Sequence, residues 1–518
     1  MANIKKIKLN AFKFQPFSKK QMQLLTWWQE DSPVSDRFIC VADGSIRAGK
    51  EQSVKSKLYT PDGFKLMGEI KKGDYVFNRK GNPVRVLDIF PQGVKDVYRV
   101  TFNDGSSCLC GKEHLWTYTT SKCITNRNYT FFTSTLSEIM NDLERFKDRK
   151  LSHQRAGKYR FPFSGCVEFN SRDVKIDPYL LGLLLGDGCF TDGVCGITFT
   201  NEEAELHRYI ADILPAYDMK YLYTPRKEGH CAYGRLAGRE RGRKTTLREY
   251  LEYYSLHGCK SGDKFIPVDY KYNSKDVRLH ILAGLINTDG SVTEGRSTIR
   301  FNTTSKKLFY DVVELARSLG MYVNSGTAID NHRKNPCYMA SIMANKELYD
   351  LLSSKHKSKI NMSTERKKSW RYITNIEYAG KDECQCILVD DDEHLYLTDD
   401  FIVTHNTVAM ITSFALYVMT HFEQQNAAIC GKSIGTLKRN VVNPLKQICE
   451  TIGYEVVEHR SENFLEIRDG DKVNFVYLFG GKDESSQDLV QGITLCSVML
   501  DEVALIDWCR AVWKHTVL

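Results

Sequence analysis

The feature that most constrains this chain is a glycine-rich motif that stops one residue short of completion. Phosphate-binding loops read G-x-x-x-x-G-K-[ST], and the final hydroxyl binds Mg2+. Residues 44–50 read GSIRAGK, but Glu51 stands where the hydroxyl belongs. Thr407 supplies this hydroxyl if residues 51–406 are removed, because GSIRAGK then continues as TVAMITSFALYVM. The sequence therefore predicts a nucleotide site that is divided by an inserted segment.

The joined sequence has the chemistry that a nucleotide site needs. Glycines leave successive backbone N–H groups free to face phosphates, and the N-terminus of the following helix adds partial positive charge. The lysine reaches the outer phosphates, and the next hydroxyl binds Mg2+. A glycine-rich turn and an unrelated threonine that match by coincidence are the alternative. We expect ATP and Mg2+ to bind the joined chain through Gly44, Arg47, Gly49, Lys50 and Thr407.

The composition indicates a cytoplasmic protein of several domains. The chain has 518 residues, of which 42% are hydrophobic and 26% are charged, as is common in globular proteins. It shows no signal peptide and no apolar run of about 18 residues, so we expect no membrane partner. Sixteen cysteines without an export signal indicate reduced thiols. The net charge of +8 alone does not decide between a solvated surface and a nucleic-acid partner.

The order of local patterns divides the chain into nested parts. Strand–turn–strand patterns dominate residues 51–165, and strand patterns return at 365–406. Helical and strand patterns alternate between them, over 170–362. We therefore predict an all-β domain that is interrupted by an α+β domain. Both lie inside an α/β host domain, whose two pieces are residues 1–50 and 407–518.

The end of the inserted segment carries a chemical signature, VTHNT, which ends at Thr407. Asn406 can attack its own main-chain carbonyl and break the chain, and His405 can polarise that junction. With the preceding residues DDDEHLYLTDDFI, this signature resembles the last two sequence blocks of inteins. The resemblance covers residues 51–406 and implies an all-β Hint fold. It also implies self-splicing without a cofactor, which joins Lys50 to Thr407.

The first residue of the segment departs from the usual intein pattern. Most inteins begin with Cys or Ser, whereas a carboxylate such as that of Glu51 cannot undergo the acyl shift. Trp116, Cys386 and Thr404 together resemble the class 3 inteins, which lack a nucleophile at the first position. The resemblance implies that Trp116 and Thr404 shape the site around Cys386. A lone cysteine is usually a small buried hydrophobe, and we assign that ordinary role to Cys384.

The class 3 resemblance implies an order of events. His114 activates the peptide bond that follows Lys50, and the thiolate of Cys386 takes the N-terminal segment as a thioester. Thr407 then accepts this segment as an ester. Asn406 cyclises and releases the intein, and an ester-to-amide shift completes the splice.

A weak internal duplication lies in the interrupting domain. Residues 179–188 read YLLGLLLGDG and residues 280–290 read HILAGLINTDG, and both resemble LAGLIDADG homing endonucleases. The resemblance implies two helices packed along a pseudo-twofold axis, with Asp187 and Asp289 holding Mg2+ for cleavage of double-stranded DNA. Two ordinary buried helices with Asp-Gly ends are the alternative. The basic run at 234–250 could follow DNA phosphates, although such runs are often only solvated faces.

The host sequence adds a second nucleotide motif, CSVMLDEVAL. After its apolar strand, Asp501 would support Mg2+ and Glu502 would orient the attacking water. Together with the joined loop, this motif resembles the large subunit of phage terminases. The resemblance implies a DNA-packaging ATPase with the terminase small subunit, the portal or procapsid and the packaged genome as partners. The sequence ends at Leu518, so we expect only part of the ATPase domain here. A helicase is the alternative host.

A different class of function also fits the sequence. Glu51 could mark an element that no longer splices and only cleaves DNA or serves as a scaffold. In either case, the resemblance places the protein in the cytoplasm of a phage-infected or prophage-carrying bacterial cell.

Overall fold

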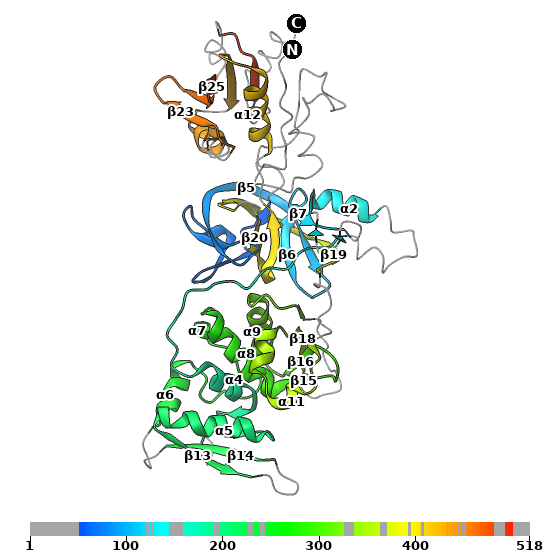
Figure 1. Ribbon diagram of the computed structural model, residues 1–518, viewed down its shortest axis with the longest axis vertical. Coiled ribbons are helices and arrows are strands. Elements are labelled where there is room, and N and C mark those ends of the chain that lie inside the picture. The colour runs from blue at the N-terminus through cyan, green and yellow to red at the C-terminus, as the bar shows by residue number, and fades with distance from the viewer. Residues whose placement is uncertain are drawn as a thin grey trace.

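The structure is a computed structural model with three bodies (Figure 1). One end carries a mixed sheet with helix α12, the centre is β-rich, and the other end carries helices α4 and α8. The described residues are 51–120, 124–125, 128–129, 131–144, 159–190, 196–225, 231–238, 244–325, 336–362, 370–391, 395–405, 409–431, 434–442, 445–446, 449, 452–480 and 493–500.

The central body is built on two long antiparallel strands that are distant in sequence. Strand β5 (Pro83–Phe102) pairs with β19 (Ile373–Val389) across most of their lengths. Strand β1 (Gln52–Ser53) lies between β19 and β6 (Ser107–Gly111), and β4 (Tyr75–Phe77) completes the order β19-β1-β6-β5-β4. The start and the end of the inserted segment therefore meet in one sheet. Short paired strands complete the body: β2 (Lys57–Thr60), β3 (Gly63–Leu66), β7 (Leu115–Tyr118), β8 (Ile124–Thr125), β9 (Asn128–Tyr129), β10 (Phe132–Thr135), β20 (Leu395–Thr398) and β21 (Ile402–His405), with helix α2 (Leu136–Glu144).

The second body repeats one connectivity twice. Its two sheets have the orders β11-β12-β14-β13 and β15-β16-β18-β17, so strands in matching positions pair alike. The first copy comprises α4 (Pro178–Asp187), β11 (Gly188–Cys189), β12 (Thr198–Thr200), α5 (Ala204–Ile213), β13 (Met219–Thr224), β14 (Tyr233–Gly238) and α6 (Thr246–Tyr253). The second comprises α8 (Lys275–Asp289), β15 (Gly290–Val292), β16 (Thr298–Thr303), α9 (Lys306–Ser318), β17 (Val323–Asn324), β18 (Tyr338–Met343) and α10 (Lys346–Leu351).

Helices α4 and α8 pack against each other through glycine, as the duplicated motif predicts. A Cβ atom on Gly182 would lie 2.4 Å from the Ile281 carbonyl oxygen, and one on Gly284 would lie 2.5 Å from the Tyr179 carbonyl oxygen. Only the missing side chains allow this approach of the two backbones. Both helices end immediately before a glycine, and each ends in one of the two aspartates, Asp187 and Asp289.

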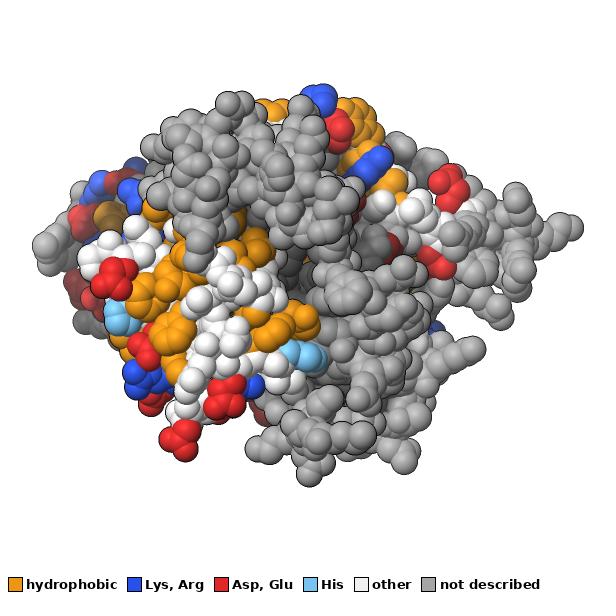
Figure 2. Space-filling view, turned by 90° about the horizontal axis from the view of Figure 1, so that it is seen from above, with side chains coloured by type: hydrophobic (Ala, Val, Ile, Leu, Met, Phe, Trp, Pro, Cys, Tyr) orange, Lys and Arg blue, Asp and Glu red, His pale blue; other side chains and the backbone are white. Residues whose placement is uncertain are grey.

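The third body contains the described part of the host. Helix α12 (Ala409–His421) precedes β22 (Asn426–Gly431), which pairs in parallel with β25 (Lys472–Gly480) and β26 (Ser497–Leu500). Strands β23 (Glu455–His459) and β24 (Phe464–Asp469) extend this sheet in antiparallel order. Figure 2 views the molecule from this end, where hydrophobic side chains lie exposed between acidic and basic ones. This mixed sheet agrees with the predicted α/β class.

Two predictions drawn from composition can be compared with the described residues. The twelve cysteines that the structure describes are not joined in disulfides, which is compatible with the predicted reduced thiols. Within the same parts of the chain, every helix is too short or too polar to cross a membrane. The domain boundaries set by sequence pattern remain predictions.

Candidate functional site

A buried histidine forms the centre of the candidate splicing site. His114 lies just before β7, where its N–H donates to the Gly111 carbonyl (3.2 Å) and its carbonyl accepts from the Leu136 N–H (2.9 Å). Its Nε2 is hydrogen-bonded to Oγ1 of Thr404 on β21. Both side chains are fully buried. The fold thus brings together two predicted site residues that lie 290 positions apart.

Burial sets the charge state of this histidine. Desolvation lowers the pKa of His114 to about 3, so the ring is neutral at pH 7. A neutral imidazole has one N–H donor and one acceptor nitrogen. If Nε2 accepts the Thr404 hydroxyl, then Nδ1 carries the proton. Within the described residues Nδ1 has no hydrogen-bond partner, so it is available to a neighbouring peptide group.

The indole ring of Trp116 packs against the imidazole of His114. The two rings meet edge to face, with centroids 5.5 Å apart. The indole also packs against Phe102 and Phe161, at centroid distances of 5.7 and 5.5 Å. The two phenylalanine rings hold the indole in place, and the indole in turn packs against the imidazole. The predicted role of Trp116 in shaping the site is compatible with this packing.

Cys386 lies on strand β19, in a small apolar cluster with Phe90 and Leu388. Its thiol is fully buried. Strands β1 and β19 are in antiparallel register, with Gln52 opposite Gln385 and Ser53 opposite Cys384. Continuing this register by one residue places Cys386 opposite the first residue of the inserted segment. The backbone thus brings Cys386 to the predicted N-terminal junction, although its thiol packs in a different cluster from His114.

The neighbouring Cys384 lies in an environment that keeps its thiol protonated. Burial and the carboxylate of Glu51 raise the pKa of the Cys384 thiol to about 12. Only the thiolate is a good nucleophile, and about one part in 100,000 of such a thiol is ionised at pH 7. This environment agrees with the structural role that the sequence analysis assigns to Cys384.

Tyr396 is a candidate site residue that sequence reasoning missed. It lies on β20 opposite Thr404, and its hydroxyl donates to Oε1 of Gln52 (2.8 Å). Gln52 in turn donates to the hydroxyl of Thr398. Burial raises the pKa of Tyr396 far above its usual value, with Cys386 among the nearby groups. Because these contacts span more than 340 positions, no local motif could have revealed them.

Several predicted residues lie outside the described part of the chain. These are the junction residues Asn406 and Thr407, the nucleotide-site residues Gly44, Arg47, Gly49 and Lys50, and the acidic pair Asp501 and Glu502. For His405 only the backbone is described, at the end of β21. Their roles therefore remain predictions.

The two predicted endonuclease carboxylates share one electrostatic environment. Burial and the charge of Asp187 raise the pKa of Asp289 to about 7. Burial also raises the pKa of Asp187, although Asn201 donates a hydrogen bond of 2.7 Å to its Oδ2. The ammonium of Lys264 lies between the helices' ends and donates to the carbonyls of Gly186 and Gly188 at 2.9 and 2.7 Å.

Lys264 is a second candidate that sequence reasoning missed. It is almost fully buried, and burial lowers the pKa of its ammonium, which Asp289 and Asp187 partly counteract. A lone lysine in the stretch SGDKFIP gives no signal that separates it from an exposed lysine. The donor set fits Mg2+, since two converging carboxylates repel each other until a hard cation lies between them.

The structure describes only part of the basic run at 234–250. Two of its described basic side chains form ion pairs with a carboxylate of the same chain. Lys244 and Arg248 both form ion pairs with Glu252, the latter at 3.1 Å. These two side chains are therefore held on helix α6 rather than left for a ligand. Arg235 lies on β14, in the sheet that follows α4. Phosphate contact by this run stays a prediction.

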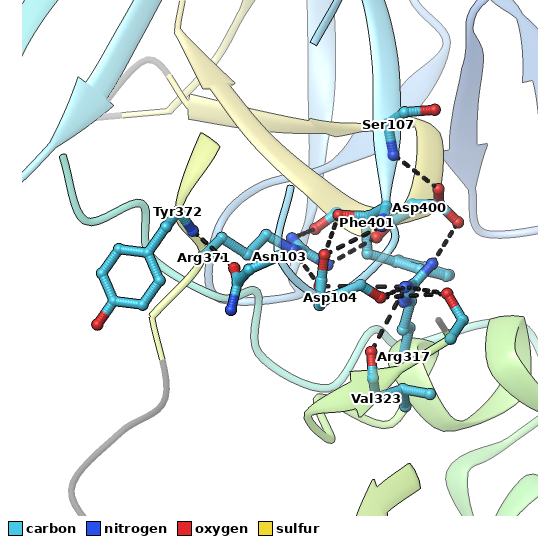
Figure 3. A network of polar contacts seen from close by, with 11 residues as sticks. Asn103, Asp104, Ser107, Arg317, Val323, Arg371, Tyr372, Asp400 and Phe401 are labelled. Carbon is cyan, nitrogen blue, oxygen red and sulfur yellow. Dashed lines mark hydrogen bonds and ion pairs between the residues drawn. The ribbon is translucent and has the colours of Figure 1, made fainter. Parts of the chain in front are cut away.

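A buried network joins the central body to the second one (Figure 3). Arg371 donates from Nε to Oδ2 of Asp104 (2.8 Å) and from its terminal nitrogens to the carbonyls of Asp400 and Phe401 (both 2.9 Å). Arg317 of helix α9 donates to Oδ1 of Asp400 (2.6 Å) and to the Asp104 carbonyl (2.9 Å). Asp400 and Phe401 adopt left-handed backbone angles just before β21. The network thus fixes the turn that leads to Thr404.

Removing Arg371 should destabilise the fold strongly. Burial alone would raise the pKa of Asp104, but Arg371 and Arg317 hold it below its usual value, so this carboxylate stays charged. Replacing Arg371 by alanine leaves the buried charge poorly paired, which costs about 3–5 kcal/mol. Urea unfolding measures the loss. The matched control Arg99→Ala removes a half-exposed pair with Glu377 and should cost less than about 1 kcal/mol. Equal losses would contradict this account.

Comparisons with known proteins give one family match. Residues 276–355 match the LAGLIDADG-like domain family. This range holds helix α8, the second sheet and helix α10. The chain therefore contains a LAGLIDADG-like domain at the second copy of the duplicated unit, as the sequence predicts.

Three known proteins are each similar to part of the chain. The replicative DNA helicase DnaB of Mycobacterium intracellulare is 26% identical over 379 residues, which is 69% of this chain and 59% of that protein. The large terminase of a thermophilic bacteriophage is 46% identical over 21% of this chain and 27% of its own, with a TM-score of 0.20. The gp41-1 intein is 29% identical over 17% of this chain and 61% of its own, with a TM-score of 0.14.

The extent of these matches agrees with a nested arrangement. The chain spans about three fifths of the curated relative that it matches. The 379 aligned residues exceed the 50 residues before the inserted segment and the 112 after it, so the match must reach into that segment. The matches are thus compatible with the arrangement recognised from the sequence, an intein that carries a LAGLIDADG-like domain inside an ATPase host.

Proposed function

We propose that residues 51–406 excise themselves and join Lys50 to Thr407. The observation that carries this proposal is the buried contact between His114 and Thr404, with Trp116 against the imidazole. These residues come from opposite ends of the segment, and they meet just before the predicted C-terminal junction. No cofactor is needed, because the chemistry exchanges acyl groups only.

The first step transfers the N-terminal segment to Cys386. Its thiolate attacks the Lys50 carbonyl carbon, a C–S bond forms, and the C–N bond to Glu51 breaks. The departing amine takes a proton from Nδ1 of His114, which has no other hydrogen-bond partner among the described residues, and the proton that the Cys386 thiol lost on forming its thiolate returns the imidazole to its neutral form. A ring that is neutral at pH 7 can carry this proton when Nε2 accepts from Thr404.

The later steps transfer the N-terminal segment, residues 1–50, from Cys386 to Thr407. The Thr407 hydroxyl attacks the thioester, which forms a C–O bond and releases the Cys386 thiolate. The side-chain nitrogen of Asn406 then attacks its own carbonyl carbon and breaks the peptide bond to Thr407, with His405 polarising that bond. The freed amine of Thr407 finally replaces its own ester oxygen, so that an amide joins Lys50 to Thr407.

The LAGLIDADG-like domain would cleave double-stranded DNA at a site in the uninterrupted host gene. Asp187 and Asp289 would hold Mg2+, which supplies a Lewis acid for phosphodiester hydrolysis. Both aspartates end helices that pack against each other, and burial, with a smaller contribution from the charge of Asp187, raises the pKa of Asp289, which supports this role. Lys264 lies near both and would offset negative charge at the scissile phosphates.

The joined host would be an ATPase that uses Mg2+. We favour the large subunit of a phage terminase, which packages DNA with the small subunit and the portal or procapsid in the bacterial cytoplasm. The residues of the joined phosphate loop and of the motif at Asp501 support this choice. The DnaB relative supports a helicase as the second candidate.

Intact mass after expression of the whole chain in a bacterial cytosol tests the splicing proposal. We expect a joined product of residues 1–50 and 407–518, beside residues 51–406 ending in a succinimide, one water lighter than the free acid. A chain that stays unbroken, in which only DNA cleavage is active, would instead establish the splicing-defective alternative.

A further inference from the structure

The first residue of the inserted segment occupies a fitted site. Glu51 is only 8% exposed, and its carbonyl accepts a hydrogen bond from the Gly111 N–H at 2.7 Å. Its carboxylate lies over Gly111, where an added Cβ atom would come within 2.2 Å of Oε2. Its Oε1 lies 3.4 Å from Nζ of Lys95 on strand β5. Gly111 thus binds the main-chain carbonyl of Glu51 and leaves space for its side chain, and Lys95 pairs with its negative charge.

We propose that Glu51 is a positioning residue, which with Lys95 and Gly111 holds the scissile peptide toward Cys386. This inference rests on the proposed splicing function. The usual nucleophile is absent from this position, and the side chain that replaces it anchors the junction instead. The missing side chain of Gly111 admits the carboxylate, and the ammonium of Lys95 compensates its charge.

The strand register explains why an anchor here would matter. Strand β1 starts at Gln52, between β19 and β6, and the extended β1–β19 register places residue 51 opposite Cys386. A side chain fixed at residue 51 limits rotation of the peptide bond that precedes it. Precise orientation of a carbonyl toward a nucleophile contributes strongly to the rate of acyl transfer.

The carboxylate of Glu51 also affects Cys384, one of the two cysteines on strand β19. Its charge is the second cause, after burial, that keeps the Cys384 thiol protonated. Cys384 and Cys386 are two residues apart on one strand and face the same side of the sheet. The carboxylate of Glu51 therefore helps to keep the Cys384 thiol in its less nucleophilic, protonated form.

The test measures the first step in the full chain. Thr407→Ala and Asn406→Ala together block the later steps, and dithiothreitol releases residues 1–50 from the thioester. In this background we expect Glu51→Ala to slow release about tenfold. Lys95→Ala should slow it about threefold, the scale of a partly exposed ion pair. The matched control Lys381→Ala removes an exposed pair with Asp96 on the same two strands and should have no effect.

Two further readouts separate positioning from general folding. High salt should slow the wild-type chain toward the Lys95→Ala rate and leave Lys95→Ala unaffected, because the ion pair is screened. The exchange of charges in Glu51→Lys with Lys95→Glu should recover part of the rate that Glu51→Lys loses. Release at the wild-type rate by both Glu51→Ala and Lys95→Ala would overturn the positioning role alone. A wild-type chain that never releases residues 1–50 would overturn the splicing function and this role together.

Discussion

Replacing Cys386 by alanine is expected to abolish splicing, with the first step slowed about a thousandfold or more, because the proposed reaction then lacks the thiolate that takes the N-terminal segment. The register of β1 and β19 brings Cys386 opposite the first residue of the segment. Glu51 itself cannot form the acyl intermediate. Intact mass should show an unbroken chain, or a chain cleaved only at the C-terminal junction.

Cys384→Ala is the matched control for this experiment. Cys384 lies two residues away on the same strand and is equally buried. Its pKa of about 12 keeps it in the inert thiol form, so its replacement should leave the joined product intact at a small cost in stability. Equal splicing by the two variants would contradict the class 3 assignment. Loss of splicing in both would show that packing at this strand, rather than a specific thiol, limits the reaction.

Only those splicing-site residues that belong to short sequence motifs could be predicted from the sequence. Trp116, His114 and Thr404 are recognisable by residue type and spacing, and the structure packs them together. The contact between Glu51 and Lys95 and the hydrogen bond between Tyr396 and Gln52 could not be predicted in this way. They depend on strand register between segments hundreds of residues apart, which no local pattern encodes.

The same distinction holds for the fold. The two apolar motifs predict helices α4 and α8 and their close contact, since small residues permit it. They do not predict that each helix is followed by a sheet of the same strand order. The sequence also separates the two domains as independent units, whereas Arg317 reaches from α9 to Asp104 and Asp400 of the central body. Such contacts arise from packing of complete domains.

The second large effect is expected at the endonuclease carboxylates. Asp187→Asn and Asp289→Asn should each reduce Mg2+-dependent DNA cleavage about a hundredfold or more, because one ligand for the metal is lost. Splicing should remain, since it uses other residues. Cleavage of a plasmid that carries the uninterrupted host sequence measures the first effect, and intact mass measures the second. The exposed Asp212→Asn serves as the control. Loss of splicing in the Asp187 variant would show that contacts such as that of Arg317 couple the two domains.

At Asp289 we also expect a conflict between the stability of the fold and DNA cleavage. The pKa of Asp289 is about 7 in the folded protein and about 3.9 in an unfolded chain, so the folded state binds more protons between these values. Stability without Mg2+ should therefore fall as pH rises from about 4 to about 7. The full shift corresponds to ~4 kcal/mol, and partial exposure of Asp289 reduces the expected loss to about 1–3 kcal/mol.

The Asp289→Asn variant should therefore be inactive toward DNA yet more stable than the natural chain at pH 8. Urea unfolding without Mg2+ at pH 5 and pH 8 checks this, because the two chains should differ at pH 8 and nearly coincide at pH 5. Added Mg2+ should stabilise the natural chain and not the variant, since binding to the folded state alone adds stability. A natural chain that is equally stable at both pH values would mean that Asp289 is not buried in a position that disfavours its charge. A stabilised, inactive variant would instead show that the fold holds the Asp289 carboxylate in a buried position near Asp187 at a cost in stability, a cost that a bound cation would offset.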